Sequence, residues 1–423
     1  MSGSVLRRVG AGEVEALRRN AVDPRALAIA SEIVLRVERG GFEAAVLEAR
    51  RLGDLPDGAP PILDAAACRA ALLALPGEQR SLLERTASRI REFASAQRRA
   101  LISMSVSVPG GTAGHEAVPV ETAGCYAPGG RFPLPSSVLM TAVTARVAGV
   151  EKVWVASPKP TAVTMAACAV AQADGLVTFG GAQAVALLAL GGGPVPRCDV
   201  IVGPGNAYVT AAKYLVSAYA GIDMLAGPSE LVVVADGSAR PDVIAMDLLA
   251  QAEHDPDALP VLVVFDERVA MEVERALAEA LAELDTRETA SASIARGFWV
   301  LADSMEQAAS VCNALAPEHL QLSMADPAGL RSLLRHYGAL FLGDGACEVL
   351  GDYGIGPNHV LPTGGAARRS GGLSVFSFLR LRTWLRVEDS LAADPVLADA
   401  EALAKLEGLS AHSLAAWLRR LPS

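Results

Sequence analysis

Short apolar runs alternate with longer Ala- and Leu-rich runs through the middle of the chain. KVWVASP, LVTFGG and DVIVGPG each end in a turn rich in Gly or Pro, and each is followed by a run with apolar residues at helical spacing. A strand, a glycine turn and a helix, repeated three times, predict a parallel doubly wound sheet. The same succession returns over residues 230–345, from ELVVVADG to YGALFLGDG. The sequence therefore predicts an α/β protein with two Rossmann-like parallel-sheet lobes.

Helical extensions flank these lobes. The first hundred residues have helical spacing, as in LLERTASRIREFASAQRRALISM, and from about Gly372 the pattern returns to short helices. The 423 residues are enough for two cores, because single cores stop growing at about 250–300 residues. The expected parts are an N-terminal extension (1–22), a discontinuous first lobe (23–119 with 231–371), a second lobe (120–230) and a C-terminal tail (372–423). The tail is too short for its own core, so it must dock on its own lobes or on a partner subunit.

Charge and apolar content exclude several classes of partner. The net charge is −10, and the Lys and Arg residues are scattered along the chain. The electrostatic field of the protein would therefore repel nucleic acid and would not attract an anionic membrane surface. The apolar runs are far shorter than the roughly 18–20 residues of a membrane span, and the N-terminus lacks the apolar core of a secretory signal. Six cysteines without a C-x-x-C pair favour reduced thiols. We expect a cytoplasmic protein that binds neither nucleic acid nor membrane.

The stretch LLAQAEHDPDA ends an otherwise apolar helix in polar groups. Pro241 suits the first turn of that helix and Pro256 stops it, so Gln251 and His254 lie on one face of its last turns. An imidazole nitrogen beside an amide oxygen is half of a mixed N/O zinc shell. The same residues could also form an ordinary polar helix end.

In ALAPEHLQL, Glu318 and His319 stand at the entrance of a strand-like run. A carboxylate beside an imidazole could supply a general base and a second proton acceptor. A surface pair in a loop is the equally simple alternative.

Two more segments concentrate ionisable groups. LGDYGIGPNHVLPTGG places Asp352 and His359 in a Gly-rich loop, whose backbone could approach a ligand closely or simply turn tightly. LEGLSAHSL puts Glu407 and His412 on the tail, where an ordinary helical end would not concentrate such groups.

Neither of the standard phosphate-loop motifs, G-x-G-x-x-G and G-x-x-x-x-G-K-[ST], occurs. Three glycine turns between strands and helices are present instead: YAPGG from Tyr126 to Gly130, FGGAQAV from Phe179 to Val185, and VGPGNAYV from Val202 to Val209. Each could direct the N–H groups of a helix N-terminus at a phosphate, or could be structural only. The polar groups beside these turns are Tyr126, Gln183 and Asn206.

Eight motifs, in this order, resemble the histidinol dehydrogenase family. They are YAPGGRFPLPSSVLM, GGAQAVALLA, IVGPGNAYV, DMLAGPSE, LLAQAEHDPDA, APEHL, GDYGIGPNHVLPT and EGLSAH. The resemblance runs from about EFASAQ to EGLSAH and so covers most of the chain.

The resemblance implies one Zn²⁺ per subunit, held by Gln251, His254 and Asp352. The fourth ligand would be His412, supplied by the tail of the other subunit of a homodimer with shared active sites. These ligands would belong to the discontinuous first lobe and to the tail.

The resemblance also implies the catalytic and binding residues. Glu318 and His319 match the catalytic pair, and NAD would bind the second lobe at Tyr126, Gln183 and Asn206. The substrate would contact a wider set that overlaps the metal site: Ser229, Gln251, His254, His319, Asp352, His359, Glu407 and His412.

The implied reaction is the four-electron oxidation of L-histidinol through L-histidinal to L-histidine with two NAD⁺, at the end of histidine biosynthesis. His319 would take the alcohol proton, Glu318 would activate the water that hydrates the aldehyde, and zinc would orient the substrate. One alternative is a paralogous zinc- and NAD-dependent dehydrogenase of another small polar alcohol, such as a sulfonated diol. A zinc hydrolase and a non-catalytic zinc protein are further alternatives, and Mn²⁺ or Co²⁺ would also suit an N/O shell.

Overall fold

The computed structural model describes residues 5–17, 22–129 and 132–420. Parts of the expected N-terminal extension 1–22, and Gly130 of the YAPGG turn, lie outside the described residues. The chain forms two compact units, one of residues 1–96 and 120–378 and the other of residues 97–119 and 379–423. The larger unit contains two six-stranded sheets, which confirms the predicted α/β fold with two parallel-sheet lobes.

The first sheet has β5 at its centre, and we call its part of the chain the β5 lobe. In spatial order its strands are β2 (Ile62–Asp64), β7 (Gly175–Val177), β6 (Lys152–Ala156), β5 (Thr122–Tyr126), β8 (Val200–Val202) and β9 (Gly221–Ile222). All neighbours pair in parallel except β2, which runs antiparallel to β7. The five parallel strands follow the spatial order 3-2-1-4-5 of a doubly wound fold.

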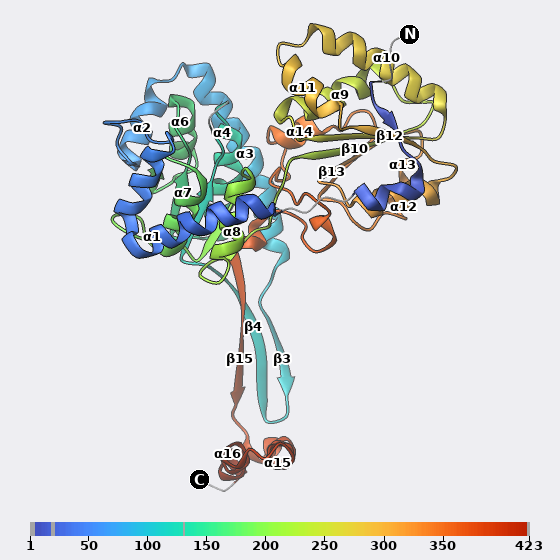
Figure 1. Cartoon of the computed structure of the whole chain (residues 1–423). Helices are drawn as coiled ribbons and strands as arrows, with labels where there is room; N and C mark the ends of the chain where they lie inside the picture. The colour runs from blue at the N-terminus through green and yellow to red at the C-terminus, as the bar shows by residue number, and fades with distance from the viewer. Residues whose placement is uncertain (1–4, 18–21, 130–131, 421–423) are drawn as a thin grey trace. The chain divides into compact units, whose positions relative to one another are not determined.

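Helices cover both faces of this sheet (Figure 1). A buried cluster joins the sheet to α1, α7 and α8, and α2 packs against α6. The helices of the lobe are α1 (Pro24–Arg51), α2 (Ala65–Ala74), α4 (Pro135–Val138), α5 (Thr144–Ala148), α6 (Ala162–Val170), α7 (Gly181–Leu190) and α8 (Ala207–Val216). A π-helical turn (Leu139–Val143) joins α4 to α5.

The second sheet has β10 at its centre and defines the β10 lobe. Its strands, all parallel, are β1 (Arg7–Arg8), β12 (Phe298–Leu301), β11 (Leu259–Val264), β10 (Glu230–Ala235), β13 (His319–Ser323) and β14 (Ala339–Leu342). Its helices are α9 (Pro241–His254), α10 (Glu267–Glu283), α11 (Arg287–Ile294), α12 (Met305–Leu315), α13 (Pro327–Arg331) and α14 (Glu348–Asp352). Strands β12, β11, β10, β13 and β14 repeat the order 3-2-1-4-5.

The apolar run of β10 is continuous because both faces of the strand are buried. Leu231 and Val233 pack with α9, α10 and α11, whereas Val232 and Val234 pack with α12 and the 3-10 helix Ala11–Leu17. A strand covered by helices on both sides loses the polar alternation of a half-exposed strand. The continuous apolar run LVVVA therefore indicates that β10 lies at the centre of the sheet.

The expected grouping of residues 23–119 with 231–371 differs from the observed packing. Strand β2 pairs with β7, and α1 packs against α7 and α8, so both belong with the β5 lobe. Helix α3 (Gly77–Ala100) contacts the β10 lobe, where the Arg89 side chain donates to the carbonyl of Gly354. Helical spacing shows that a helix buries one face, but it does not show which sheet that face covers.

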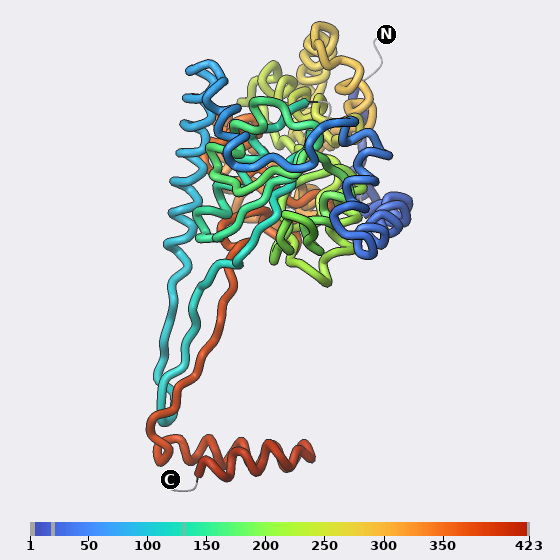
Figure 2. Tube along the Cα trace, turned by 90° about the vertical axis from the view of Figure 1, so that its left-hand side faces the viewer, coloured from blue at the N-terminus to red at the C-terminus, as the bar shows by residue number. Residues whose placement is uncertain are grey.

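The second unit contains more strand than the expected short helices. Strand β15 (Leu379–Val387) pairs antiparallel with β4 (Gly111–Pro119), which pairs with β3 (Met104–Val108). The sequence LRLRTWLRV alternates apolar and basic residues, which is the period of a strand. Beyond it, α15 (Ser390–Leu406) and α16 (Ser410–Arg420) pack side by side, as Figure 2 shows at the C-terminal end of the chain.

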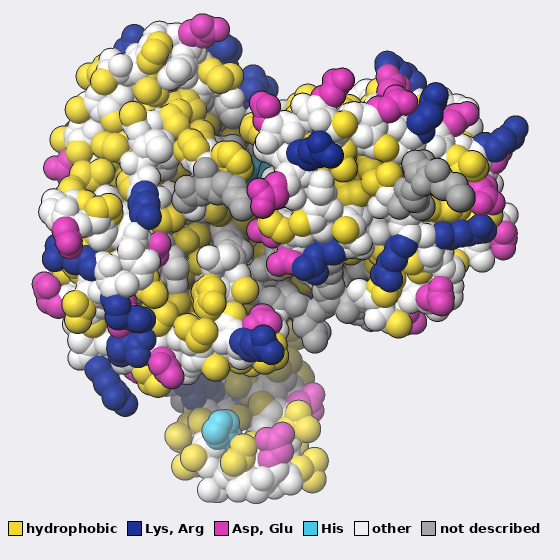
Figure 3. Space-filling view, turned by 45° about the horizontal axis from the view of Figure 1, so that its top comes forward, with side chains coloured by type: hydrophobic (Ala, Val, Ile, Leu, Met, Phe, Trp, Pro, Cys, Tyr) yellow, Lys and Arg dark blue, Asp and Glu magenta, His cyan; other side chains and the backbone are white. Residues whose placement is uncertain are grey.

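Charged side chains of both signs are mixed on the surface, as the scattered Lys and Arg residues of the sequence predict (Figure 3). On the face drawn in Figure 3, Lys and Arg side chains are interspersed with Asp and Glu and form no continuous basic stripe. Within the described residues, no helix is both long enough and apolar enough to span a membrane.

Candidate metal and catalytic site

Helix α9 brings an amide and an imidazole to its last turns. The helix begins at Pro241, ends at His254 and is followed by extended backbone at Asp255, as its sequence predicts. Gln251 is fully buried, and both polar atoms of its side chain lack a hydrogen-bond partner. Buried polar atoms are almost always paired, so an unpaired amide marks a place where a ligand belongs.

The predicted pair of Glu318 and His319 stands at the start of strand β13. Glu318 and His319 are both buried, and the Glu318 carboxylate accepts the N–H of Glu230 at 3.0 Å. His319 is the first residue of β13 and lies in register with Leu231 of β10. The surface-loop alternative for this pair is therefore wrong, because both side chains lie inside the protein.

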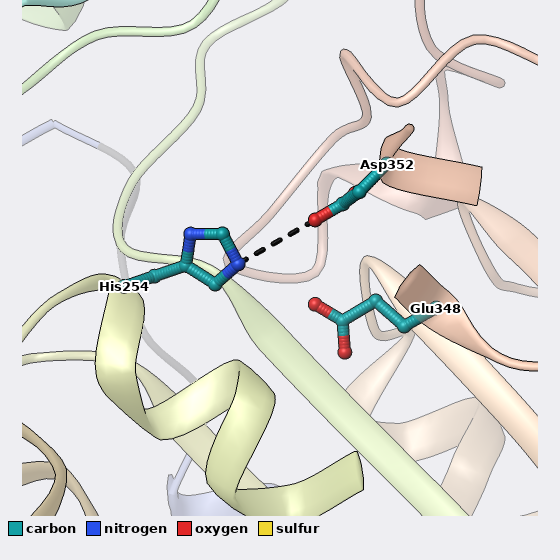
Figure 4. Close-up of side chains that lie close together, drawn as sticks. All are labelled: His254, Glu348 and Asp352. Carbon is teal, nitrogen blue, oxygen red and sulfur yellow. Dashed lines mark ion pairs between the residues drawn. The ribbon is translucent and has the colours of Figure 1, made fainter. Parts of the chain in front are cut away.

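Helix α14 completes a cluster around the end of α9. His254 Nε2 lies 3.4 Å from Asp352 Oδ2, and His319 Nε2 lies 3.9 Å from Asp352 Oδ1. Glu348 Oε1 lies 3.7 Å from His319 Nδ1. Figure 4 shows His254, Glu348 and Asp352 directed toward one another, the first from α9 and the other two from α14.

Glu348 is not among the residues that the sequence motifs single out. Its position four residues before Asp352 places the two carboxylates on one face of α14, and this E-x-x-x-D spacing was the available signal. Glu348 is 2% exposed, although a carboxylate near a Gly-rich loop is ordinarily expected in solvent.

Burial governs the acid–base properties of the inner groups. It raises the pKa of Glu318 and of Glu348 well above the ordinary value and lowers the pKa of His319 to about 4. A raised carboxyl pKa makes Glu318 a stronger base once it is ionised, and a lowered imidazole pKa keeps His319 neutral. The His319 imidazole therefore offers a lone pair at neutral pH, and Glu318 can accept a proton after its carboxyl has ionised.

The outer pair shifts in the opposite sense. The hydrogen bond to Asp352 raises the pKa of His254. Burial alone would raise the pKa of Asp352, yet its hydrogen bond with His254 and the nearby imidazoles hold that pKa below its usual value. The two residues thus favour an imidazolium–carboxylate pair, which a cation bound by the same atoms would replace.

The cluster fits a divalent metal ion. One ligand atom each from His254, Glu348 and Asp352 lies within 4.8 Å of the others, and the unpaired amide of Gln251 stands one turn before His254. Imidazole nitrogen with carboxylate and amide oxygen is a set that zinc accepts.

Two predicted substrate residues border this cluster. His359 Nδ1 lies 2.8 Å from the backbone oxygen of Asp352, and its Nε2 lies 3.4 Å from Ser137 Oγ of α4. Ser229 lies beside Glu318, and its hydroxyl acts to lower the pKa of that carboxyl against the larger effect of burial. Ser137 lies in the motif YAPGGRFPLPSSVLM, but a Ser in a Pro-rich turn has no distinctive spacing that would mark it as a site residue.

The other two predicted residues are in the second unit. Glu407 follows α15 and His412 lies in the first turns of α16, and both are exposed in that unit. They therefore belong to a different compact unit from the cluster.

The three residues expected to bind NAD lie at the carboxyl edge of the β5 sheet. Tyr126 ends β5, and its hydroxyl accepts the Gly181 N–H at 3.1 Å. Gln183 is fully buried in the first turn of α7 and donates to Asp54 at 2.9 Å, while its side-chain oxygen has no partner. Asn206 caps α8 by accepting two backbone N–H groups at 3.1 Å.

The two lobes use opposite edges of their sheets. The metal-type cluster stands at the amino edge of the β10 sheet, where β10 and β13 begin and α9 ends. The glycine turns stand at the carboxyl edge of the β5 sheet, the usual edge for a nucleotide. Fold and site together define a class, that of two-lobed α/β proteins with a buried Glu–His pair beside a cluster of possible cation ligands.

Comparison with known proteins places the chain within that class. Residues 17–420 match the histidinol dehydrogenase family model. The histidinol dehydrogenase of Aromatoleum aromaticum is 40% identical over 432 residues, covering 98% of each chain, and that of Thermus thermophilus is 42% identical over 399 residues, covering 94% of this chain and 95% of its own. The crystal structure of histidinol dehydrogenase from Elizabethkingia anophelis matches with a TM-score of 0.91 at 28% identity, covering 99% of each chain. The chain belongs to the histidinol dehydrogenase family, which confirms the resemblance of its motifs.

Proposed function

We propose that this chain catalyses the NAD-dependent oxidation of L-histidinol through L-histidinal to L-histidine, the last two steps of histidine biosynthesis. The observation that carries the proposal is the buried Glu318–His319 pair beside the His254–Asp352 contact. A proton acceptor, a second base and a cation site within one cluster supply what two successive oxidations of one substrate need.

The metal would be zinc, held by Gln251, His254 and Asp352, with His412 from the tail of a second copy. The unpaired amide of Gln251 and the 3.4 Å contact of His254 with Asp352 support this assignment. When bound, the ion supplies positive charge that fixes the imidazole and amino groups of the substrate. Glu348 stands close enough to act as an alternative ligand.

His319 would accept the proton of the substrate hydroxyl in the first oxidation. Its lowered pKa leaves the imidazole neutral, so a nitrogen lone pair is available for that proton. The carbon that bears this hydroxyl would lose a hydride, and bound NAD⁺ would supply the acceptor for it. The first step thus turns an alcohol into an aldehyde and releases one NADH and one proton.

Glu318 would activate the water that adds to the aldehyde. The carboxylate oxygen that accepts the Glu230 N–H is held in place, and burial raises the pKa of this carboxyl, which strengthens the base. The resulting hydrate loses a second hydride to a second NAD⁺ and becomes the carboxylate. No thiol is needed for this route, unlike aldehyde oxidations that pass through a cysteine adduct.

Further side chains would bind the two small molecules. Ser229 and His359 adjoin the reacting pair and the metal ligand, while Glu407 would reach the substrate from the tail of the second copy. Tyr126, Gln183 and Asn206 would bind NAD. Burial raises the pKa of the Tyr126 hydroxyl to about 12, so it stays neutral and can form a hydrogen bond.

The chain would act as a homodimer. Its second unit exposes many large apolar side chains along β15, α15 and α16, including Leu385, Leu391 and Leu406, at 68%, 86% and 85% exposure. Apolar surface of this extent is typical of a subunit interface. A second copy of the chain is the partner that would place His412 in the neighbouring site.

The test is the stoichiometry of purified enzyme with L-histidinol. We expect two NADH for every L-histidine formed, with zinc present at one ion per subunit. Turnover of another small alcohol in preference to L-histidinol would support a paralogous dehydrogenase. Hydrolysis without NAD⁺ would instead support a zinc hydrolase, and either result would overturn the proposal.

A further inference from the structure

A buried ion pair lies next to the turn of residues 203–206, which follows β8. Lys213 of α8 contacts Asp223, which follows β9, through Nζ and Oδ1. The two side chains are 2% and 0% exposed. The reaction proposed above uses neither residue.

The pair holds both backbone polar groups of a single glycine. Lys213 Nζ donates to the carbonyl oxygen of Gly203 at 2.9 Å, and the Gly203 N–H donates to Asp223 Oδ2 at 2.7 Å. The other carboxylate oxygen of Asp223 accepts the Met224 N–H at 2.6 Å, which fixes the carboxylate from its own strand end. Gly203 is therefore clamped by two opposite charges.

The clamped glycine sits against Tyr126. Its φ is +115°, and a Cβ at this position would lie 2.0 Å from the carbonyl oxygen of Tyr126. Only glycine allows this backbone conformation and this close approach. From Gly203 the chain passes through Pro204 and Gly205 to Asn206, which caps α8. The Lys213–Asp223 clamp thus fixes a turn that packs against Tyr126 and ends at Asn206, two of the proposed NAD contacts.

Stability alone does not account for the choice of charged residues here. Removing two charges from water costs free energy, and an apolar pair of similar volume often stabilises a protein as well or better. A charged pair, however, forms strong hydrogen bonds of defined direction with a backbone amide and a carbonyl. We infer that Lys213 and Asp223 are positioning residues, which hold the 203–206 turn beside Tyr126 and so set the shape of the NAD pocket. This inference rests on the proposed function, because it takes Tyr126 and Asn206 as NAD contacts.

The decisive variant is the double substitution Lys213→Met/Asp223→Leu. It removes the clamp without leaving one charge buried alone, so the lobe should still fold even if either single variant does not. The matched control is Lys152→Met/Glu121→Leu, which removes an exposed ion pair from the amino edge of the same sheet.

Two measurements need no catalysis. Hydrogen exchange should become faster in the peptide covering residues 203–209 of the double variant, and calorimetry should show NAD⁺ binding weakened by about tenfold or more, as for the loss of a charge-assisted hydrogen bond. In turnover, the KM for NAD⁺ should rise by a similar factor, whereas the KM for L-histidinol stays within about twofold. The control variant should match the wild type in all of these.

Asn206→Ala separates the two proposals. If Asn206→Ala weakens NAD⁺ binding but the clamp variant binds NAD⁺ like the wild type, the positioning role is overturned and the NAD site stands. If both variants bind like the wild type, the proposed NAD site itself is wrong and the inference fails with it. Unchanged hydrogen exchange over residues 203–209 in the clamp variant also overturns the inference.

Discussion

His254 Nε2 lies 3.4 Å from Asp352 Oδ2, although the two residues are 98 positions apart in the chain. The contact joins the last residue of α9 to the last residue of α14. The ends of two helices are thus held together by groups that we propose as metal ligands. Loss of the metal should therefore weaken substrate binding and lower the stability of the folded protein.

Replacing His254 by Ala should remove most of the zinc affinity. Loss of a residue that only supports a ligand costs about 10–100-fold in metal affinity, and loss of a ligand itself should cost at least as much. Bound metal stabilises the folded state by mass action, so added zinc should raise Tm in the wild type and not in the variant. The control His336→Ala changes a histidine of the same lobe outside the cluster. A zinc-dependent rise in Tm that survives in His254→Ala would exclude His254 as a ligand.

Replacing Glu318 by Gln should separate the two oxidations. The amide keeps the shape and can still accept the Glu230 N–H, but it cannot take a proton from water. Oxidation of L-histidinal to L-histidine should slow by about 10²–10⁴-fold, the usual contribution of a general base, while oxidation of the alcohol is spared. Rapid-quench analysis of a single turnover measures both steps. A normal rate for the second oxidation would remove Glu318 from that role.

Removal of the chain from Gly408 onward should abolish turnover, because the proposed fourth ligand comes from a second copy. A sharper form of this test mixes two inactive variants, His254→Ala and His412→Ala. In a mixed dimer, the site that combines α9 of the His412→Ala chain with the tail of the His254→Ala chain is intact, whereas the other site carries both substitutions. Random reassociation of equal amounts makes about half of the dimers mixed, so about a quarter of all sites, and of wild-type activity, should be restored. Zinc content should recover in parallel. Full activity of a monomeric truncated chain, or no recovery on mixing, would contradict a shared site.

Removing one charge of the Lys213–Asp223 pair should destabilise the protein much more than removing both. Lys213→Met leaves a carboxylate alone in a site with no exposure, which typically costs about 3–5 kcal/mol, whereas the double variant Lys213→Met/Asp223→Leu should lie close to the wild type. Urea denaturation of the three proteins measures the difference. Equal loss of stability in the single and double variants would show that the charges do not compensate each other.

Gly203→Ala should destabilise the β5 lobe by more than about 2 kcal/mol, since it combines a left-handed backbone angle with a steric conflict. The matched control is Gly237→Ala, where an added Cβ meets nothing within 4 Å. Thermal unfolding compares the two variants with the wild type. If the Tm of Gly203→Ala equalled that of the control, the turn would have to accommodate the added Cβ with no loss in the free energy of unfolding.

The motifs predicted much of the site because each one is local. Gln251 and His254 share a helix face, Glu318 and His319 are adjacent, and Asp352 directly precedes a Gly-rich segment, so residue type and spacing identified all five as candidates. The structure places Asp352 at the end of α14 and not in the predicted loop. Glu348 escaped notice although its spacing from Asp352 was visible, because a lone carboxylate acquires meaning only through burial beside His319. The Lys213–Asp223 pair was missed for the same reason, since its partners are ten positions apart with strand β9 between them.

By itself, the sequence determined the two parallel-sheet lobes, the ends of α9, and the family to which the chain belongs. These features follow from local periodicity, turn chemistry and ordered motifs. Only the tertiary structure decided that α1 and β2 join the β5 sheet, that LRLRTWLRV is a strand, and that the acid–base pair is buried at an amino edge. The reason is physical: an apolar helix face or an alternating strand fits any complementary surface, and the choice among surfaces depends on how the whole chain packs.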